Sequence, residues 1–448
     1  GGYARVTVRL RSVPEAETLT LGIADTEVEI ATEPPAGPRI VSSALSPEMD
    51  RLTVYLRGGQ FAIAEVRIDG EALAPSAPAE LQSAGGMLPI EVPLQPAWER
   101  GSFHDVSVTT ASGERAGTMV RAMRPFFSLG MWGYRNDGLT MEALVRDYCE
   151  AFEDHLFNTK MPGAHTDFLE SEEGFDVLDD TGLRLAAHTP NEVTTGSDQV
   201  YARFLFDEPD VADYYVELPW TDRVGVYAQN LVQRQQDWTQ ADPVNPCLLN
   251  VDMTFKPENW LTYGQLPDVF AVDPYYQNRL SAAWWSHPMR VRQFLTPYYV
   301  HAVSEIARSG CEPSPLHVIL NCVSQHTDDR VFRYGTPEEK RIEFYHALSA
   351  GARAISYWWF TPYGRHVGCG AEDAGGYAML QELARLNAQA RAAEELLAEG
   401  CPAHAPAEAE PFATAQPAWL MARTLLAATD AAVVTLVNLD HASDRQGT

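Results

Sequence analysis

The sequence predicts a multidomain protein in which β-sandwich segments precede a (β/α)8 TIM barrel and a further β-domain begins after it. Two observations lead to this fold class. Between about residues 125 and 400, eight short apolar runs alternate with stretches of helical period, which is the size and rhythm of a (β/α)8 barrel. Outside this stretch, strands follow one another with only turns between them. The predicted units are residues 1–36, the end of a β-sandwich; 37–122, an immunoglobulin-like β-sandwich; 123–400, the barrel; and 410–448, part of a C-terminal β-domain.

The first 122 residues show the period-two alternation of half-buried strands. Turn signals at Asp69-Gly70 and Ser112-Gly113 separate such runs, and a proline-rich cluster at residues 34–38 divides the segment into two. This pattern is typical of β-sandwiches. No cluster of acidic and aromatic residues stands out in either part, so we expect both to be structural or sugar-holding rather than catalytic.

The barrel prediction rests on eight apolar runs and on the helical patterns between them. A doubly wound open sheet is the rival fold, but no Gly-x-Gly-x-x-Gly motif follows any strand, and no cofactor is predicted. Helices are expected over residues 141–148, 291–308, 337–348 with a stop at Gly351, and 380–397; a linker over 402–417 precedes a strand at 431–438. The predicted barrel strands are 126–131, 156–161, 184–188, 201–207, 247–251, 269–273, 316–322 and 353–359.

The charge and composition restrict the classes of partner. Of the 448 residues, 45% are hydrophobic and 10% aromatic, which indicates a globular protein of two or three domains. A formal net charge of -28 disfavours nucleic acid and anionic membranes, and no apolar run is long enough to span a membrane. The sequence does not predict the oligomeric state. Both ends, at Gly1 and Thr448, look trimmed, and whether a signal peptide preceded Gly1 stays open.

The six cysteines are scattered along the chain. They lack the close pairs of a zinc site and are too few for a disulfide scaffold, so we predict mostly buried thiols, with one disulfide left open. No metal is predicted. The cysteines are Cys149, Cys247, Cys311, Cys322, Cys369 and Cys401.

Acidic and aromatic residues recur where the predicted strands end. The carboxyl ends of barrel strands form one edge, where active sites are built. Carboxylates framed by flat rings suit a sugar, which stacks on the rings while acids act on the glycosidic oxygen. We therefore predict Glu208, Asp273 and Asp207 as catalytic residues. The predicted substrate-binding residues are Trp132, Tyr134, His188, Asp252, Tyr275, Tyr276, Asn321, Gln325, Trp358 and Trp359, with Trp220, Trp284 and Trp285 as further stacking candidates.

Several of these residues have structural alternatives. His188 can be a hydrogen-bonded structural histidine, and Trp358 or Trp359 can belong to the core. Asp252 can cap the next helix, and Asp273 can anchor Tyr275 or a loop amide. The recurrence of such residues at one edge of the barrel favours a functional site.

Four short motifs resemble the clan A glycoside hydrolases, and the resemblance covers roughly residues 125–400. It implies a (β/α)8 enzyme flanked by β-sandwich domains that acts on oligo- or polysaccharides, is secreted or periplasmic, and uses Glu208 as general acid and base. Asp207 stands where the family has Asn, and strand seven, at residues 320–325, lacks the family's nucleophilic glutamate. The motifs are Phe206-Asp207-Glu208-Pro209, Val272-Asp273-Pro274-Tyr275-Tyr276, Thr336-Pro337-Glu338-Glu339 and, at residues 351–358, Gly-Ala-Arg-Ala-Ile-Ser-Tyr-Trp.

The absent nucleophile leaves several mechanisms open. Inversion requires Asp273 or Asp252 to activate a water, and we expect Asp273 to lie across the cavity from Glu208, with room for that water. Substrate assistance by a 2-acetamido group requires Asp207 and Glu208 to act together, which is possible only if the strand ends or kinks between them, near Pro209. A catalytically inactive sugar-binding barrel is another alternative, and a metal-dependent hydrolase using His188, Asp207 and Asp273 is a further one.

Overall fold

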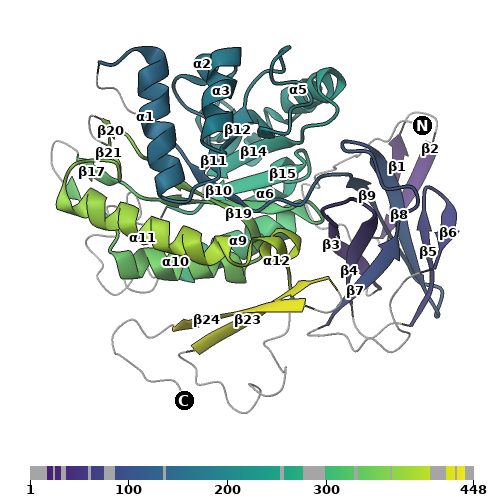
Figure 1. The fold of residues 1–448 in the computed structure, drawn as a ribbon. Helices are drawn as coiled ribbons and strands as arrows, with labels where there is room; N and C mark the ends of the chain where they lie inside the picture. Colours follow the sequence, from purple (N-terminus) through teal and green to yellow (C-terminus); the bar gives the residue numbers. More distant parts are fainter. Residues whose placement is uncertain are drawn as a thin grey trace.

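The computed structural model divides into a β-sandwich, a barrel and a C-terminal β-hairpin that lies beside both (Figure 1). No helix in the described part of the chain is both long enough and apolar enough to cross a membrane. The structure describes residues 18–23, 26–31, 37–58, 62–74, 86–134, 138–252, 257–275, 298–326, 331–363, 366–403, 420–428 and 431–438.

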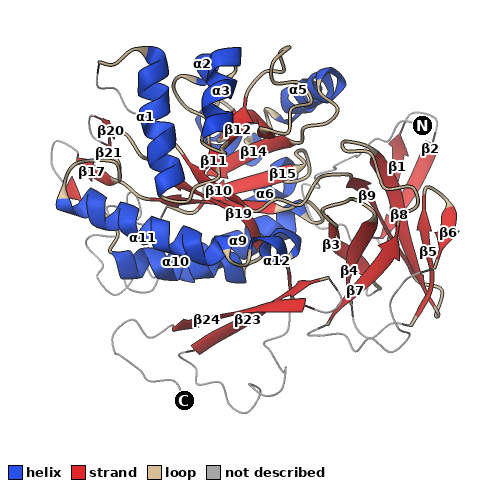
Figure 2. Ribbon diagram, viewed as in Figure 1, coloured by secondary structure: helices blue, strands red, loops and turns tan. Residues whose placement is uncertain are grey.

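Eight parallel strands close into a barrel, and they are the eight that the sequence predicts. The barrel confirms this part of the fold and excludes the open doubly wound sheet. Figure 2 shows the helices packed outside the strands. The strands, in order around the barrel, are β10 (Ser128–Met131), β11 (Thr159–Lys160), β12 (Arg184–Ala187), β13 (Val200–Asp207), β14 (Cys247–Asp252), β15 (Val269–Asp273), β16 (Leu316–Asn321) and β19 (Ala352–Trp358).

The barrel interior is filled by side chains of alternating size. Ala186, Ala202 and Ala271 leave room for the larger Phe204 and Leu248, and all five are buried. A separate and larger apolar cluster lies between the strands and the surrounding helices. Strands buried on both faces explain why the sequence shows continuous apolar runs rather than alternation.

The helices follow the predicted pattern with one correction. The segment expected as a single helix over residues 380–397 forms two, because Ala393 leaves the helical conformation and the second helix, α12, packs on the sandwich and on β19. No Gly or Pro marks this break. Of the helix predicted over 291–308, residues 291–297 lie outside the described residues. The longer helices are α1 (Met141–Asp154), α3 (Glu172–Asp180), α5 (Ala228–Ala241), α9 (Tyr298–Cys311), α10 (Pro337–Ser349), α11 (Ala374–Arg391) and α12 (Glu394–Glu399).

Helix α10 begins and ends as predicted. Thr336 caps it in a capping box with Glu339, and Gly351 follows its end at φ 91°. A Cβ at Gly351 would lie 2.6 Å from the ring of Pro402, so both the conformation and the space require glycine. The shorter helices are α2 (Thr166–Leu169), α4 (Pro209–Tyr215), the 3₁₀ turn η1 (Trp220–Asp222) and α6 (Pro257–Tyr263).

The N-terminal domain consists of two antiparallel sheets over a shared core. Leu52, Val54, Val66, Ile90 and Val106 are fully or almost fully buried in that core. The arrangement is a β-sandwich, and its immunoglobulin-like identity stays a prediction. One sheet orders β3 (Arg39–Leu45), β4 (Arg51–Arg57) and β7 (Met87–Pro93); the other orders β6 (Glu71–Leu73), β5 (Ile63–Ile68), β8 (Phe103–Thr110) and β9 (Arg115–Arg121).

Smaller sheets complete the fold. A hairpin of β1 (Thr18–Ile23) and β2 (Thr26–Ala31) precedes the sandwich, and the boundary of a separate domain at residue 36 stays a prediction. The C-terminal sheet orders β22 (Cys401–Pro402), β23 (Leu420–Ala427) and β24 (Ala431–Asn438). A sheet of β18 (Val331–Phe332), β17 (Ser324–His326), β21 (His366–Val367) and β20 (Pro362–Tyr363) follows barrel strands β16 and β19.

The sandwich and the barrel are joined by buried polar contacts. The Arg353 guanidinium, at the start of β19, donates to Ser43 O at 2.7 Å and to Ser42 Oγ at 2.8 Å. Arg57 pairs with Glu312 at 2.6 Å, and the Tyr55 hydroxyl donates to Glu399 O at 2.9 Å. All six cysteines are described, buried and free, which confirms the prediction of core thiols.

Candidate active site

Glu208 is the first residue after strand β13, and the chain changes direction there. Its backbone adopts the left-handed conformation, with φ 50° and ψ 58°, and Pro209 begins helix α4 directly after it. Adjacent residues of a continuing strand would face opposite sides, and the left-handed residue interrupts that alternation. The Glu208 N–H donates to Asn250 O at 3.0 Å on the neighbouring strand. The kink that joint action of Asp207 and Glu208 requires is therefore present.

Three carboxyl groups meet at the ends of three consecutive strands. Glu208, Asp252 and Asp273 each place a carboxylate oxygen within 4.8 Å of the others, and we call them the acidic cluster. Asp252 and Asp273 are register partners on β14 and β15, with exposures of 5% and 2%, whereas Glu208 is half-buried. The cluster lies at the carboxyl end of the barrel, the edge where the sequence predicts the site.

The expected position of Asp273, across the cavity from Glu208, is wrong. Asp273 is hydrogen-bonded to Glu208. Strands two places apart in a sheet are separated by about 10 Å. The left-handed turn and the reach of the longer side chain close this gap. The register of β13 against β14 also shifts between Phe204 and Phe206, so the end of β13 does not follow the regular ladder.

The surroundings of Asp273 favour its protonated form. Burial, followed by the negative charges of Asp252 and Glu208, raises the pKa of Asp273 well above its usual range. Among the residues that the structure describes, Asp273 Oδ1 has no hydrogen-bond partner, so nothing there stabilises a negative charge on that oxygen. Glu208 and Asp273 therefore form a hydrogen-bonded pair in which the protonated form of Asp273 is favoured.

Two further polar residues extend the cluster. Asn250, buried in β14, donates through Nδ2 to Asp207 Oδ1 at 2.9 Å and more weakly to Asp273 Oδ2 at 3.4 Å. Asp210 accepts from the Asp252 N–H at 3.0 Å, and burial raises the pKa of Asp210 well above its usual range. Asp207 is exposed to solvent, yet the surrounding protein raises its pKa, which is typical of a group in a concave site.

Aromatic rings stand beside the acidic cluster. Tyr275 stacks on Trp358 with ring centroids 5.6 Å apart, and Trp359 follows at 6.0 Å from Trp358. Tyr134 meets Trp359 edge to face at 5.7 Å. All four side chains are partly exposed. Burial, then the charges of Asp273, Glu208 and Asp207, raise the pKa of Tyr275 well above its usual range, so this aromatic wall borders the carboxylates directly.

Some predicted binding residues lie elsewhere. Trp132 is buried in the barrel interior, where its indole N–H donates to Ser356 Oγ at 3.1 Å, which is a packing role. Gln325 is half-buried in β17. Trp220 is 52% exposed on η1, edge to face with Tyr214. Tyr276, Trp284 and Trp285 lie outside the described residues.

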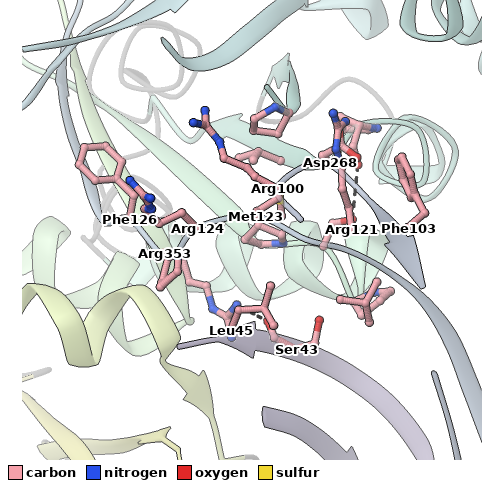
Figure 3. Close-up of a pocket in the computed structure, with 18 of the residues that line it drawn as sticks. Ser43, Leu45, Arg100, Phe103, Arg121, Met123, Arg124, Phe126, Asp268 and Arg353 are labelled. Atoms are coloured by element: carbon pink, nitrogen blue, oxygen red, sulfur yellow. Dashed lines mark hydrogen bonds and ion pairs between the residues drawn. The ribbon is translucent and has the colours of Figure 1, made fainter. Parts of the chain in front are cut away.

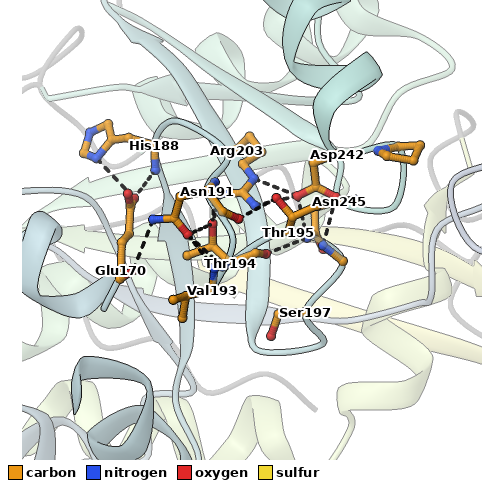
Figure 4. Close-up of polar contacts among 12 residues, drawn as sticks. Glu170, His188, Asn191, Val193, Thr194, Thr195, Ser197, Arg203, Asp242 and Asn245 are labelled. Atoms are coloured by element: carbon orange, nitrogen blue, oxygen red, sulfur yellow. Dashed lines mark hydrogen bonds and ion pairs between the residues drawn. The ribbon is translucent and has the colours of Figure 1, made fainter. Parts of the chain in front are cut away.

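His188 contacts Glu170 and is not part of the acidic cluster. Its ring Nδ1 lies 3.8 Å from Glu170 Oε1, which also accepts from the His188 N–H at 2.5 Å (Figure 4). Figure 4 also shows the buried Arg203–Asp242 pair that anchors the loop after β12. The metal set predicted from His188, Asp207 and Asp273 is therefore not brought together. In the described part of the chain, only the acidic cluster has carboxylates grouped closely enough to hold a cation.

Asn321 ends β16 where the family resemblance places a nucleophile. Its Oδ1 accepts from the Val323 N–H at 2.9 Å, which fixes the orientation of the buried amide. Within the described ranges, its Nδ2 has no acceptor. A buried amide N–H without an acceptor costs free energy, so the Asn321 Nδ2 group is suited to donate a hydrogen bond to a substrate hydroxyl.

Sequence reasoning missed Asn250, Asp210 and Lys160. The signal for Asn250 is a single amide inside an otherwise apolar strand, and the signal for Asp210 is its place two residues after Glu208. Lys160 ends β11 and is fully buried, and burial lowers its pKa to about 8. Its ammonium group donates to Met161 O. A lysine that ends a two-residue strand gives no apolar run to mark it.

Comparison with known proteins gives structural likenesses only. No family model and no curated protein matches the sequence. A β-galactosidase from the psychrophilic Marinomonas ef1 is similar at TM-score 0.45 and 12% identity, over 59% of this chain and 60% of that one. A β-glucuronidase from Bacteroides uniformis is similar at TM-score 0.35 and 11% identity, over 72% and 45%. A β-galactosidase from Bacillus circulans sp. alkalophilus is similar at TM-score 0.43 and 10% identity, over 62% and 57%. The chain thus covers less than two thirds of the length of each of these structures.

Proposed function

We propose that this chain is a glycoside hydrolase in which Glu208 is the general acid. The observation that carries the proposal is the hydrogen-bonded pair of Glu208 and Asp273 beside a wall of aromatic rings. Glycosidic cleavage needs a carboxyl group that is still protonated near neutral pH, and a second carboxylate nearby keeps it so. Glu208 is the partly exposed member of the pair and reaches the substrate, while the buried Asp273 holds the proton in reserve.

The spacing of the acidic cluster disfavours inversion through Asp273 or Asp252. Inverting enzymes hold their two carboxyl groups about 6.5 to 9.5 Å apart to admit a water. Here the nearest oxygens lie within 4.8 Å. A water does not fit between Glu208 and Asp273, which are hydrogen-bonded to each other, so Asp273 is a poor base for inversion.

Asp207 is the better candidate for that group. It is exposed, and Asn250 holds its Oδ1 at 2.9 Å, so its orientation is fixed without a loss of access. In a substrate-assisted mechanism the 2-acetamido group of the sugar attacks the anomeric carbon, Asp207 accepts the acetamido N–H, and Glu208 protonates the leaving oxygen. The proposed substrate is therefore an N-acetylhexosaminide within an oligo- or polysaccharide, met outside the cytoplasm.

The test is a screen of aryl glycosides with and without a 2-acetamido group. We expect turnover only with the 2-acetamido sugars, retention of anomeric configuration in the first product by NMR, and loss of turnover in Glu208→Gln. Inversion of configuration on a sugar without the 2-acetamido group would instead identify Asp273 as the second catalytic group, acting as the base. Binding of sugars without release would instead identify an inactive carbohydrate-binding barrel.

A metal-dependent hydrolase is the second candidate, favoured by the grouping of Glu208, Asp252 and Asp273 within 4.8 Å. Carboxylate oxygens are the ligands that Mg²⁺, Ca²⁺ and Mn²⁺ prefer. A cation and a shared proton exclude each other at this position. Elemental analysis of the purified protein, with activity measured before and after EDTA, separates the two candidates.

A further inference from the structure

A cavity of about 1010 Å³ lies between the sandwich and the amino-terminal end of the barrel (Figure 3). The residues that begin strands β12, β13, β15 and β16 line it, namely Arg184, Val200, Val269 and Leu316. The acidic cluster stands at the other ends of β13, β14 and β15. The cavity is therefore separate from the proposed active site. We call it the interface cavity.

The interface cavity is positively charged inside a strongly acidic protein. Its lining holds five arginines and two aspartates, although the whole chain has a formal net charge of -28. Positive charge that collects in a recess against the sign of the protein indicates an anionic occupant. The charged lining residues are Arg100, Arg121, Arg124, Arg184, Arg353, Asp198 and Asp268.

Three of these arginines are committed to the fold. Arg353 donates to backbone oxygens and to Ser42, as described above. Arg121 pairs with Asp268, as Figure 3 shows. Arg100 pairs with Asp198 and donates to Asn245 Oδ1 at 2.5 Å.

The charges of Arg184 and Arg124, unlike those of the other three arginines, are not closely matched by fold-forming partners. The Arg184 guanidinium lies 3.9 Å from the centroid of the Phe126 ring, and among the described residues the nearby charge of Glu394 only partly offsets its own. Among the described residues, Arg124 pairs only with Asp198, at 3.6 Å, and the same carboxylate lies closer to Arg100. Burial, then the charges of Arg100 and Arg124, lower the pKa of Arg184 to about 10, so these cations repel one another.

We propose that the interface cavity binds a small organic anion, whose carboxylate or phosphate group bridges Arg124 and Arg184. The guanidinium fork pairs with two oxygens of either group, and a bound anion removes the repulsion among the arginines. The carbon skeleton of the ligand lies on the apolar part of the lining, which includes Leu45, Met119, Met123 and Phe126. The volume is that of a site for a metabolite-sized molecule.

The experiment compares glucose 6-phosphate and citrate with glucose, at low ionic strength. Calorimetric titration and the thermal midpoint are measured for the whole chain. We expect one or both anions to bind and to raise the midpoint, and glucose to do neither. The anion that binds more tightly identifies the phosphate or the carboxylate class. Failure of both anions to bind, or an equal effect of glucose, would overturn the proposal.

Variants locate the site. Arg184→Gln and Arg124→Gln are each expected to weaken anion binding at least tenfold, and Arg184→Lys to weaken it less. Arg146→Gln is the matched control, since Arg146 pairs with Asp180 on the outer helices, and its binding should be unchanged. Glu208→Gln should also bind the anion normally, so the result is independent of the proposed glycosidase activity. Equal binding in Arg184→Gln and Arg124→Gln, or loss of binding only in Glu208→Gln, would contradict this location.

Discussion

Replacing Asp273 by Asn removes the group that keeps a proton near Glu208. A carboxylate oxygen of Asp273 lies within 4.8 Å of one of Glu208. Two negative charges at about this separation repel by about 3.5 kcal/mol at an effective dielectric constant of about 20. This repulsion raises the pKa at which the pair gives up its last proton above that of an isolated carboxyl group.

The Asp273→Asn variant therefore moves the alkaline limb of the pH profile. The general acid must be protonated, so kcat/KM falls at high pH as the pair gives up its last proton. In the variant we expect this limb at a lower pH, although the nearby Asp252 still repels the negative charge of Glu208. The profile is measured on the substrate that the screen identifies. Titration of ¹³C-labelled side-chain carboxyl groups by NMR follows the same proton without any need for activity.

Asp180→Asn is the matched control, because Asp180 is exposed on α3, far from the barrel mouth. It should leave both the pH profile and the carboxyl titration unchanged. If Asp273→Asn also leaves the alkaline limb and the NMR titration within about 0.3 units of the unmodified protein, then Glu208 and Asp273 share no proton.

Three other predictions follow from the same residues. Burial raises the pKa of Asp210 in the folded state, so the stability that its protonated form contributes is complete below about pH 4 and is lost as the pH rises. Asp210→Asn should therefore raise the thermal midpoint more at pH 8 than at pH 5, measured by calorimetry. Glu208→Gln should reduce turnover on the order of 10² or more with an unchanged circular dichroism spectrum. Tyr55→Phe should lower the free energy of unfolding by about 1 to 2 kcal/mol without changing kcat. The Tyr55 hydroxyl donates a hydrogen bond to Glu399 O and accepts one from the Ala428 N–H, both outside the acidic cluster.

The barrel and the positions of its acids were predictable, because both depend on local patterns. Apolar runs that stop at Asp207, Asp252 and Asp273 indicate strands that end at one edge, and all three lie at that edge. The contact between Glu208 and Asp273 was not predictable. It depends on one left-handed residue and on a register shift inside β13; Pro209 indicates a break near Glu208, but neither its left-handed form nor the register shift can be derived from the sequence.

The interface cavity was also beyond sequence reasoning. Arg124 and Arg184 are far apart in the chain, and each looks like an ordinary surface arginine. Only the docking of the sandwich against the barrel brings them together. The break between α11 and α12 has a similar origin, because packing against the sandwich decides it rather than helix propensity.

The attachment of Arg353 to the sandwich has a consequence for the closure of the barrel. The ribosome releases the sandwich first, and β19, the strand that completes the barrel between β10 and β16, emerges last of the eight. Arg353 stands at the start of β19 and reaches Ser42 and Ser43 on β3. The closing strand of the barrel is therefore fastened to a domain that lies about 310 residues earlier in the chain. Loss of these contacts would loosen the barrel at the strand that closes it.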